Sequence, residues 1–237
     1  MTTLRYDNIE ATAFKIVNDP SVNPFPMDDV QVQLVNGELM VYMRGHVGPS
    51  GQQPGALVAF TLPVVNNVLG AQMIYSGLNY EMKIDEASSA LLRCFESDLK
   101  WCIAAPPNST TNISNVMDGS SQKNYAEGGM WQIDNAVPVW VDSGFKPGPF
   151  PPNQWNRVAI RQSINPTTNQ FSFLSITDGG ATFSIPPNLR PLPLLSTNWD
   201  GTAVQVPQLC LQKTGFVVVW IRNVSAIFSD APILATS

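Results

Sequence analysis

The sequence predicts an all-β protein built from two packed antiparallel sheets. Apolar and polar residues alternate with a period of two along many short segments, and Pro, Gly and Asn separate these segments. No window carries the apolar stripe and cap of an amphipathic helix. Many short strands closed by turns are typical of a β-sandwich. Neither a shift in composition nor an internal repeat divides the chain, so residues 1–237 are expected to form one domain.

Two hairpins are the clearest elements. In residues 30–44, apolar side chains alternate with glutamines before Asn36-Gly37, the residue pair that a type I′ turn favours because both central residues need positive φ. The second hairpin starts at Phe171, is expected to turn at Asp178-Gly179, and returns through Ala181 to Ile185.

The remaining elements follow from the same alternation. Further strands are expected at residues 12–17, 56–61, 78–84, 91–104, 122–125, 129–135, 138–142, 155–163, 203–211 and 215–228. Loops are expected at residues 18–29, 45–55, 105–120, 145–154 and 186–202. Residues 147–152 read Pro-Gly-Pro-Phe-Pro-Pro, which cannot form a central strand because proline donates no hydrogen bond to a neighbouring strand.

Composition excludes several classes of protein. The chain has 237 residues, 44% hydrophobic and 13% charged, with a net charge of −5. A chain of this length buries about 70–75% of its unfolded surface and needs no disulfide or metal to fold. No cluster of Lys and Arg is present to bind nucleic-acid phosphates. The longest apolar run, residues 216–221, is far shorter than the ~18–20 residues of a membrane helix, so no membrane partner is expected.

The N-terminus and the cysteines bear on the compartment. The first residues lack the apolar stretch of a signal peptide, so we expect either a cytoplasmic protein or a secreted one whose signal was removed. Cys94 and Cys102 would lie about 26 Å apart along one strand and cannot pair with each other. Either could reach Cys210 across a sheet, but reduced core thiols are the favoured interpretation. Sequons at Asn108, Asn112 and Asn223 are compatible with glycosylation or with chance.

A family resemblance emerges at residues 93–100, Arg-Cys-Phe-Glu-Ser-Asp-Leu-Lys. This segment resembles a strand of the concanavalin A-like jelly roll, the fold of legume lectins, laminin-G modules, many glucanases and several polysaccharide lyases. The resemblance covers roughly residues 30–230 and consists of strand spacing and strand composition, with no signature motif. Its further elements are Gln122, residues 129–133, residues 140–144, Trp155 at the start of a strand, the hairpin at 171–185 and the strand at 216–228.

The resemblance implies that a glycan binds the concave face of one sheet. Alternation along residues 91–104 places Glu96, Asp98 and Lys100 on one face of their strand. The opposite, core-facing positions are Phe95, Leu99 and Trp101. We interpret the charged row as the floor of a saccharide groove, and the alternative is a solvated face on which the acidic residues pair with Lys100. Neighbouring strands are expected to add Gln122, Asn124, Gln132 and Arg161, with Trp140 at the rim.

These residue types suit a sugar. A pyranose ring has an apolar C–H face that stacks on an aromatic plane and hydroxyls that need both donors and acceptors. Among the six tryptophans, Trp131 and Trp140 are flanked by polar residues and are the better candidates for stacking. Trp220 lies in an apolar run and is expected in the core.

An enzyme of the same fold is the main alternative. Glu96-x-Asp98 matches the first half of the glucanase pattern Glu-x-Asp-x-x-Glu, but Trp101 stands where the last carboxylate belongs. A polysaccharide lyase would combine a charge-neutralising side chain with a His or Tyr base. The chain offers a single histidine, His46, in an expected loop. The other possible parts of a lyase site are Tyr80, Tyr125, Gln122, Arg157 and Arg161.

The sequence therefore favours a lectin-like, carbohydrate-binding domain. The first alternative is a polysaccharide lyase or a glycoside hydrolase, with Glu96 and Asp98 as the catalytic candidates. The second alternative is a structural or self-association module. No cofactor and no catalytic metal is expected. The resemblance to lectin-like sandwiches leaves a structural calcium ion as an alternative, for which Asp28-Asp29 and Asp85-Glu86 are the adjacent acidic pairs.

Overall fold

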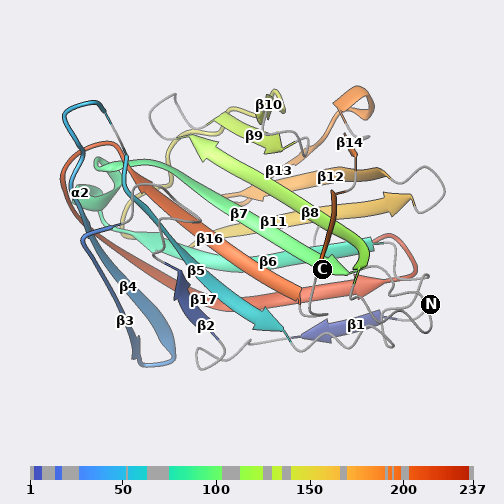
Figure 1. Ribbon diagram of the computed structural model, residues 1–237, viewed down its shortest axis with the longest axis horizontal. Helices are drawn as coiled ribbons and strands as arrows, with labels where there is room; N and C mark the ends of the chain where they lie inside the picture. Colours follow the sequence, from blue (N-terminus) through green and yellow to red (C-terminus); the bar gives the residue numbers. More distant parts are fainter. Residues whose placement is uncertain are drawn as a thin grey trace.

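The strands of the computed structural model form two antiparallel sheets (Figure 1). The structure describes residues 3–6, 14–17, 27–51, 53–62, 75–102, 113–124, 130–134, 140–165, 170–189, 192–193, 195–198 and 203–234. Sheet A has the order β13-β12-β11-β6-β17-β4-β3, with β1 beside β17 and β14 beside β12. Sheet B has the order β10-β9-β8-β7-β16-β5-β2, with β15 beside β8.

The bounds of the elements are as follows. Sheet A contains β1 (Thr3–Tyr6), β3 (Asp29–Val35), β4 (Glu38–Gly45), β6 (Tyr75–Ile84), β11 (Asn156–Asn165), β12 (Gln170–Asp178), β13 (Ala181–Ser184), β14 (Leu192–Pro193) and β17 (Gly215–Ser229). Sheet B contains β2 (Phe14–Val17), β5 (Gly55–Leu62), β7 (Leu92–Cys102), β8 (Ile113–Asn124), β9 (Met130–Asp134), β10 (Trp140–Asp142), β15 (Leu195–Asn198) and β16 (Ala203–Leu211). The helical elements of the described residues are α2 (Glu86–Ser89) and the 3-10 turn η2 (Pro187–Leu189).

The chain crosses repeatedly between the two sheets. Strands β4, β5, β6 and β7 alternate between sheet A and sheet B, and the late strands β16 and β17 insert beside them, β16 between β5 and β7 and β17 between β4 and β6. This interleaving of early and late strands is that of a jelly roll. The expected all-β, two-sheet jelly-roll sandwich is therefore confirmed.

Both sheets contribute to one hydrophobic core. Its buried members include Tyr80 and Met82 of β6, Phe95 of β7, Leu209 of β16 and Val219 of β17. The Tyr80 hydroxyl is hydrogen-bonded to the Ser97 hydroxyl, so the two sheets also meet through a buried polar contact. Apolar positions two residues apart on each strand face this interior, which fixes the outward faces of both sheets.

Both predicted hairpins are present, with one shift of register. Asn36 and Gly37 have φ values of 54° and 80° and connect β3 to β4 as expected. In the second hairpin Asp178 pairs with Ala181, so the turn residues are Gly179 and Gly180, one position later than expected. Two glycines tolerate the positive φ of this turn without strain, whereas Asp178 remains in the strand.

Strand β8 is the largest departure from the expected elements. It begins at Ile113, whereas residues 105–120 were expected to form a loop. Residues 113–116 pair with β15 and residues 116–124 pair with β7, so hydrogen bonds to neighbouring strands outweigh the weak strand preference of the Asn, Asp, Gly and Ser residues in this segment. Strands β1, β14 and β15 were also not expected, and residues 103–112 lie outside the described part of the chain.

The α-helix α2 has four residues, in agreement with the expected scarcity of helix. Asp85 caps it by accepting a hydrogen bond from the Ser88 backbone N–H at 2.6 Å, and the helix ends after one turn. Across the described residues, no helix is both long enough and apolar enough to span a membrane.

Candidate functional site

A row of polar positions crosses the outer face of sheet B, with Glu96 of β7 at its centre. Glu96 pairs with Gln208 of β16 on one side and with Gln122 of β8 on the other. Gln122 pairs in turn with Gln132 of β9, and Gln132 with Asp142 of β10. Strands in a sheet lie ~4.8 Å apart, so the five positions extend over about 19 Å. Directly paired positions share one face of a sheet, which makes the row continuous.

The core fixes which face this is. Phe95 is fully buried in the core, and Ser97 is buried against Tyr80 of sheet A. Glu96 lies between them on β7 and is half-buried on the opposite, outer face. The predicted alternation is therefore confirmed at Phe95 and Glu96.

The other charged positions of β7 continue along the same strand. Asp98 pairs with Ser120 of β8, and Lys100 pairs with Asp118. The side chains of Asp98 and Lys100, and those of Leu99 and Trp101, lie outside the described part, so their expected orientation stays a prediction.

The three amide residues occupy the strands where they were expected. Gln122 and Asn124 lie on β8, directly beside β7, and Gln132 lies on β9, directly beside β8. Asn124 pairs with Cys94, two residues before Glu96. The structure thus brings these positions together at the level of backbone register.

Trp140 lies at the edge of sheet B, as predicted for a residue at the rim. It begins the edge strand β10, is half-buried, and stands two residues before Asp142 of the polar row, which puts both on one face. Trp131 differs: its position pairs with Lys123, which is fully buried. By backbone register, therefore, position 140 lies on the face of Glu96 and position 131 on the face of Lys123.

Arg161 does not lie with the other predicted residues, and its expected placement is corrected here. It belongs to β11 in sheet A, where it is 2% exposed. Its Nη2 donates to Asn79 Oδ1 at 2.8 Å and its Nε to the Leu234 carbonyl at 3.2 Å. Alternation assigned Arg161 to an outer face correctly but could not say which sheet would hold β11.

The surroundings of Arg161 are those of a structural cation. Gly77, its partner on β6, leaves room for the guanidinium, since a Cβ there would meet Arg161 at 3.1 Å. Burial and the nearby positive charges of Arg157 and Arg5 lower the pKa of Arg161 to about 10. The side chain still carries its charge at neutral pH.

The alternative catalytic residues are not gathered on the face of sheet B. Tyr80 is buried in the core, and His46 is exposed just after β4 of sheet A. Tyr125 lies outside the described residues. Across the part of the chain that the structure describes, no group of three or more His, Cys, Asp and Glu residues could hold a metal ion.

Sequence reasoning missed a second polar surface, on the outer face of sheet A. Trp220, expected in the core, is half-buried there, and Lys83 Nζ lies 4.8 Å from the centroid of its ring. Trp155 lies 4.7 Å from the same ammonium group. The signal was available, because Lys83 alternates with the apolar residues Met82 and Ile84 on β6.

The order of the strands in the two sheets is that of a jelly roll. No family model and no curated protein matches its sequence. Similar solved structures include the CBM2 module of the evolved Dit of Lactobacillus casei BL23 phage J-1, with 10% identity, coverage of 99% of this chain and 100% of that one, and a TM-score of 0.49. A lectin from Bauhinia forficata in complex with GalNAc has 11% identity, coverage of 96% and 98%, and a TM-score of 0.44. The alginate lyase vAL-1 from Chlorella virus has 12% identity, coverage of 85% and 89%, and a TM-score of 0.46.

Proposed function

We propose that the outer face of sheet B binds a polysaccharide. The observation that carries the proposal is the polar row centred on Glu96, which crosses five adjacent strands. Amide side chains both donate and accept hydrogen bonds, and the carboxylates of Glu96 and Asp142 accept them, so the row offers what a line of sugar hydroxyls needs. Trp140 at the edge of the same face supplies an aromatic plane for the C–H face of a sugar ring.

Binding is favoured over cleavage by the residues around Glu96. Trp101 stands where the glucanase pattern requires a second carboxylate. Tyr80, one of the possible lyase bases, is buried against Ser97. A saccharide on this face would therefore meet hydrogen-bonding groups. Neither Trp101 nor Tyr80 would supply a second acid or base beside Glu96.

Replacing Glu96 tests the proposal. Glu96→Gln keeps the shape of the side chain but removes its charge, and should weaken polysaccharide binding by about 1–3 kcal/mol, the cost of one lost charged hydrogen bond. Calorimetric titration against a panel of glucans and uronans measures this change. Glu86→Gln, on an exposed residue of α2, is the matched control and should bind like the wild type.

Two activity measurements separate binding from catalysis. Release of reducing ends reports hydrolysis, and absorbance of an unsaturated product reports lyase chemistry. If Glu96→Gln binds as well as the wild type but loses turnover, Glu96 is a catalytic residue and the alternative enzyme is correct. If neither protein binds any polysaccharide of the panel, the proposed function is wrong and a structural module remains.

A further inference from the structure

The outer face of sheet A carries an ordered block of aromatic and charged side chains. Strand β6 runs between β11 and β17, and its core-facing residues include Tyr80, Met82 and Ile84. On the opposite face, Glu81 pairs with Arg157 of β11 and Arg222 of β17. In the adjacent row Lys83 pairs with Trp220, and Trp155 directly precedes β11 on the other side. The block therefore comprises Trp155, Lys83, Trp220, Arg157, Glu81 and Arg222.

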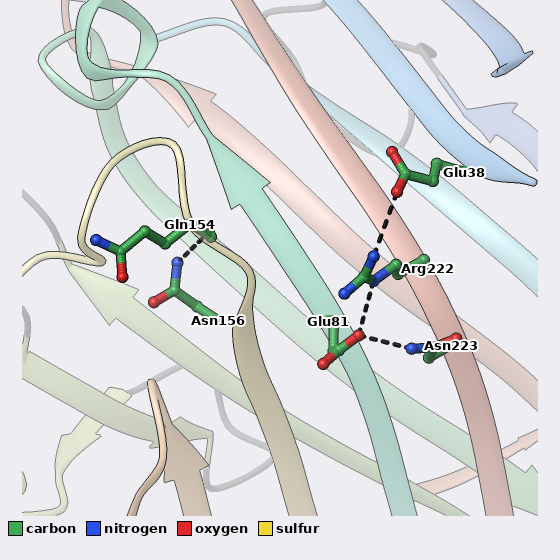
Figure 2. A network of polar contacts seen from close by, with 6 residues as sticks. All are labelled: Glu38, Glu81, Gln154, Asn156, Arg222 and Asn223. Carbon is green, nitrogen blue, oxygen red and sulfur yellow. Dashed lines mark hydrogen bonds and ion pairs between the residues drawn. The ribbon is translucent and has the colours of Figure 1, made fainter. Parts of the chain in front are cut away.

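One cation of the block is held by carboxylates. Arg222 Nε donates to Glu81 Oε2 at 2.8 Å, and Arg222 Nη1 donates to Glu38 Oε1 at 3.3 Å (Figure 2). Asn223 Nδ2 donates to the same Glu81 oxygen at 2.6 Å from a residue with a φ of 54°, where the register of β17 with β6 shifts. These contacts fix Glu81 and neutralise Arg222, while the side chains of Arg222, Glu81 and Glu38 stay part-exposed and that of Asn223 stays exposed.

The two other cations of the block have no carboxylate partner. Lys83 Nζ lies over the rings of Trp155 and Trp220, and Arg157 donates one hydrogen bond, to Asn79 Oδ1 at 3.5 Å. Within the described ranges, neither Lys83 nor Arg157 forms an ion pair. Both side chains are half-buried, and Arg161 adds a further positive charge four residues beyond Arg157 on β11. In a protein with a net charge of −5, this is a local excess of positive charge.

The chemistry of this surface fits an acidic sugar. Lys83 and Arg157 can each bind a carboxylate. The ring of Trp155 lies against both Lys83 and Arg222, so together with Trp220 it holds Lys83 in place beside Arg157. Glu81 Oε1 and Glu38 Oε2 take part in none of the contacts above and can accept hydrogen bonds from hydroxyls. Glu81 and Glu38 would repel any polyanion, but most strongly a phosphate backbone, whose charges are spaced more closely than the single carboxylate that each uronate carries. We propose that the outer face of sheet A, around Lys83 and Arg157, is a second binding site, specific for a uronate-containing oligosaccharide.

Titration with oligogalacturonate tests this site. Wild-type protein should bind it, and binding should weaken as salt is added because the contacts are between opposite charges. The double variant Lys83→Gln/Arg157→Gln should bind at least about tenfold more weakly, since one charged hydrogen bond contributes about 1.5–3 kcal/mol. Lys213→Gln, which removes an exposed cation between β16 and β17, is the matched control and should not change the affinity.

The design separates this site from the one on sheet B. Glu96→Gln should leave oligogalacturonate affinity unchanged if the ligand binds sheet A, and should reduce it if the ligand binds sheet B. Thermal unfolding of the double variant, compared with wild type, excludes loss of the fold as the cause. The proposal is overturned if wild-type protein does not bind oligogalacturonate, if the double variant binds it as tightly as wild type, or if duplex DNA competes more strongly than oligogalacturonate.

Discussion

Lys123 and Asp178 form an ion pair that joins the two sheets through the interior of the sandwich. Lys123 lies on β8 of sheet B and Asp178 on β12 of sheet A, and their side chains are 0% and 1% exposed. Lys123 Nζ also donates to the Gly148 carbonyl at 2.8 Å and lies 4.0 Å from the centroid of the Phe150 ring. Burying the two charges costs desolvation free energy, and leaving one of them without its partner costs still more. The pair therefore favours the one arrangement of the sheets in which Lys123 and Asp178 meet.

Removing one partner of this pair should destabilise the protein strongly. Asp178→Asn leaves the Lys123 ammonium in the core without its counter-charge, and should lower the free energy of unfolding by about 3–5 kcal/mol. The double variant Lys123→Met/Asp178→Leu removes both charges and should cost less than the single change. Urea unfolding measures both. Lys146→Gln is the control, because its ion pair with Asp142 is exposed and should contribute less than about 1 kcal/mol.

The same pair predicts a dependence of stability on pH. Burial lowers the pKa of Lys123 from its ordinary value of 10.5, although Asp178 opposes this shift. Between the lowered pKa and 10.5 the unfolded chain binds more protons at this residue than the folded chain, so the contribution of Lys123 to stability rises with pH.

Unfolding free energies of wild type and the Lys123→Met/Asp178→Leu variant, compared from about pH 7 to about pH 10, measure this contribution. The difference should shift in favour of the wild type as pH rises. A shift in favour of the variant would show that the folded state holds the Lys123 proton more tightly than the unfolded state, contrary to the effect of burial.

The local elements of this fold were predictable, and its long-range pairings were less so. Asn36-Gly37 is a local signal, because two adjacent residues with positive φ specify a turn without help from the rest of the chain. Residues 113–120 carry no such signal: their Asn and Ser side chains suit a loop, and hydrogen bonds to β7 and β15 make them a strand. The ion pair of Lys123 could not be predicted from the sequence either, because Asp178 is 55 residues away along the chain.

In the candidate site, too, the placements that depend on a single strand were predictable, and those that depend on strand pairing were not. Alternation on β7 placed Glu96 outward and Phe95 inward from sequence alone, and both placements are confirmed. Gln208 and Asp142 were missed, because membership of the polar row depends on which strands pair and in which register. Arg161 was misplaced for the same reason: alternation gives a side of the strand but not the identity of the sheet.

Trp140 should contribute to saccharide binding through its ring. Trp140→Ala should weaken the binding of a neutral glucan by about 0.5–1.5 kcal/mol, the usual contribution of one aromatic contact, while Trp140→Phe should retain most of the affinity. Trp155→Ala alters a tryptophan on the outer face of sheet A and should leave this affinity unchanged. If Trp155→Ala has the larger effect on a neutral glucan, the glucan binds sheet A, and the face around Glu96 is not its site.

The cysteines should be reduced, and one pair of them should be able to form a disulfide. Cys94 is buried and Cys210 is half-buried. They are Cα partners on the adjacent antiparallel strands β7 and β16. Directly opposed residues of such strands have Cα atoms about 4.5–5.5 Å apart, within the ~4.4–6.8 Å that a disulfide allows. Cys102, at the other end of β7, pairs with Val116 and has no such neighbour at its register position on β8.

We therefore expect three titratable thiols when the protein is purified under reducing conditions and then denatured. Oxidised glutathione should convert two of them into a disulfide, with release of two molecules of reduced glutathione, and peptide mapping should find Cys94 joined to Cys210. The variant Cys210→Ser should form no intramolecular disulfide, whereas Cys102→Ser should form it as the wild type does. A disulfide that includes Cys102 would contradict the register between β7 and β16. In that register Cys210 lies opposite Cys94, and Cys102 lies at the other end of β7.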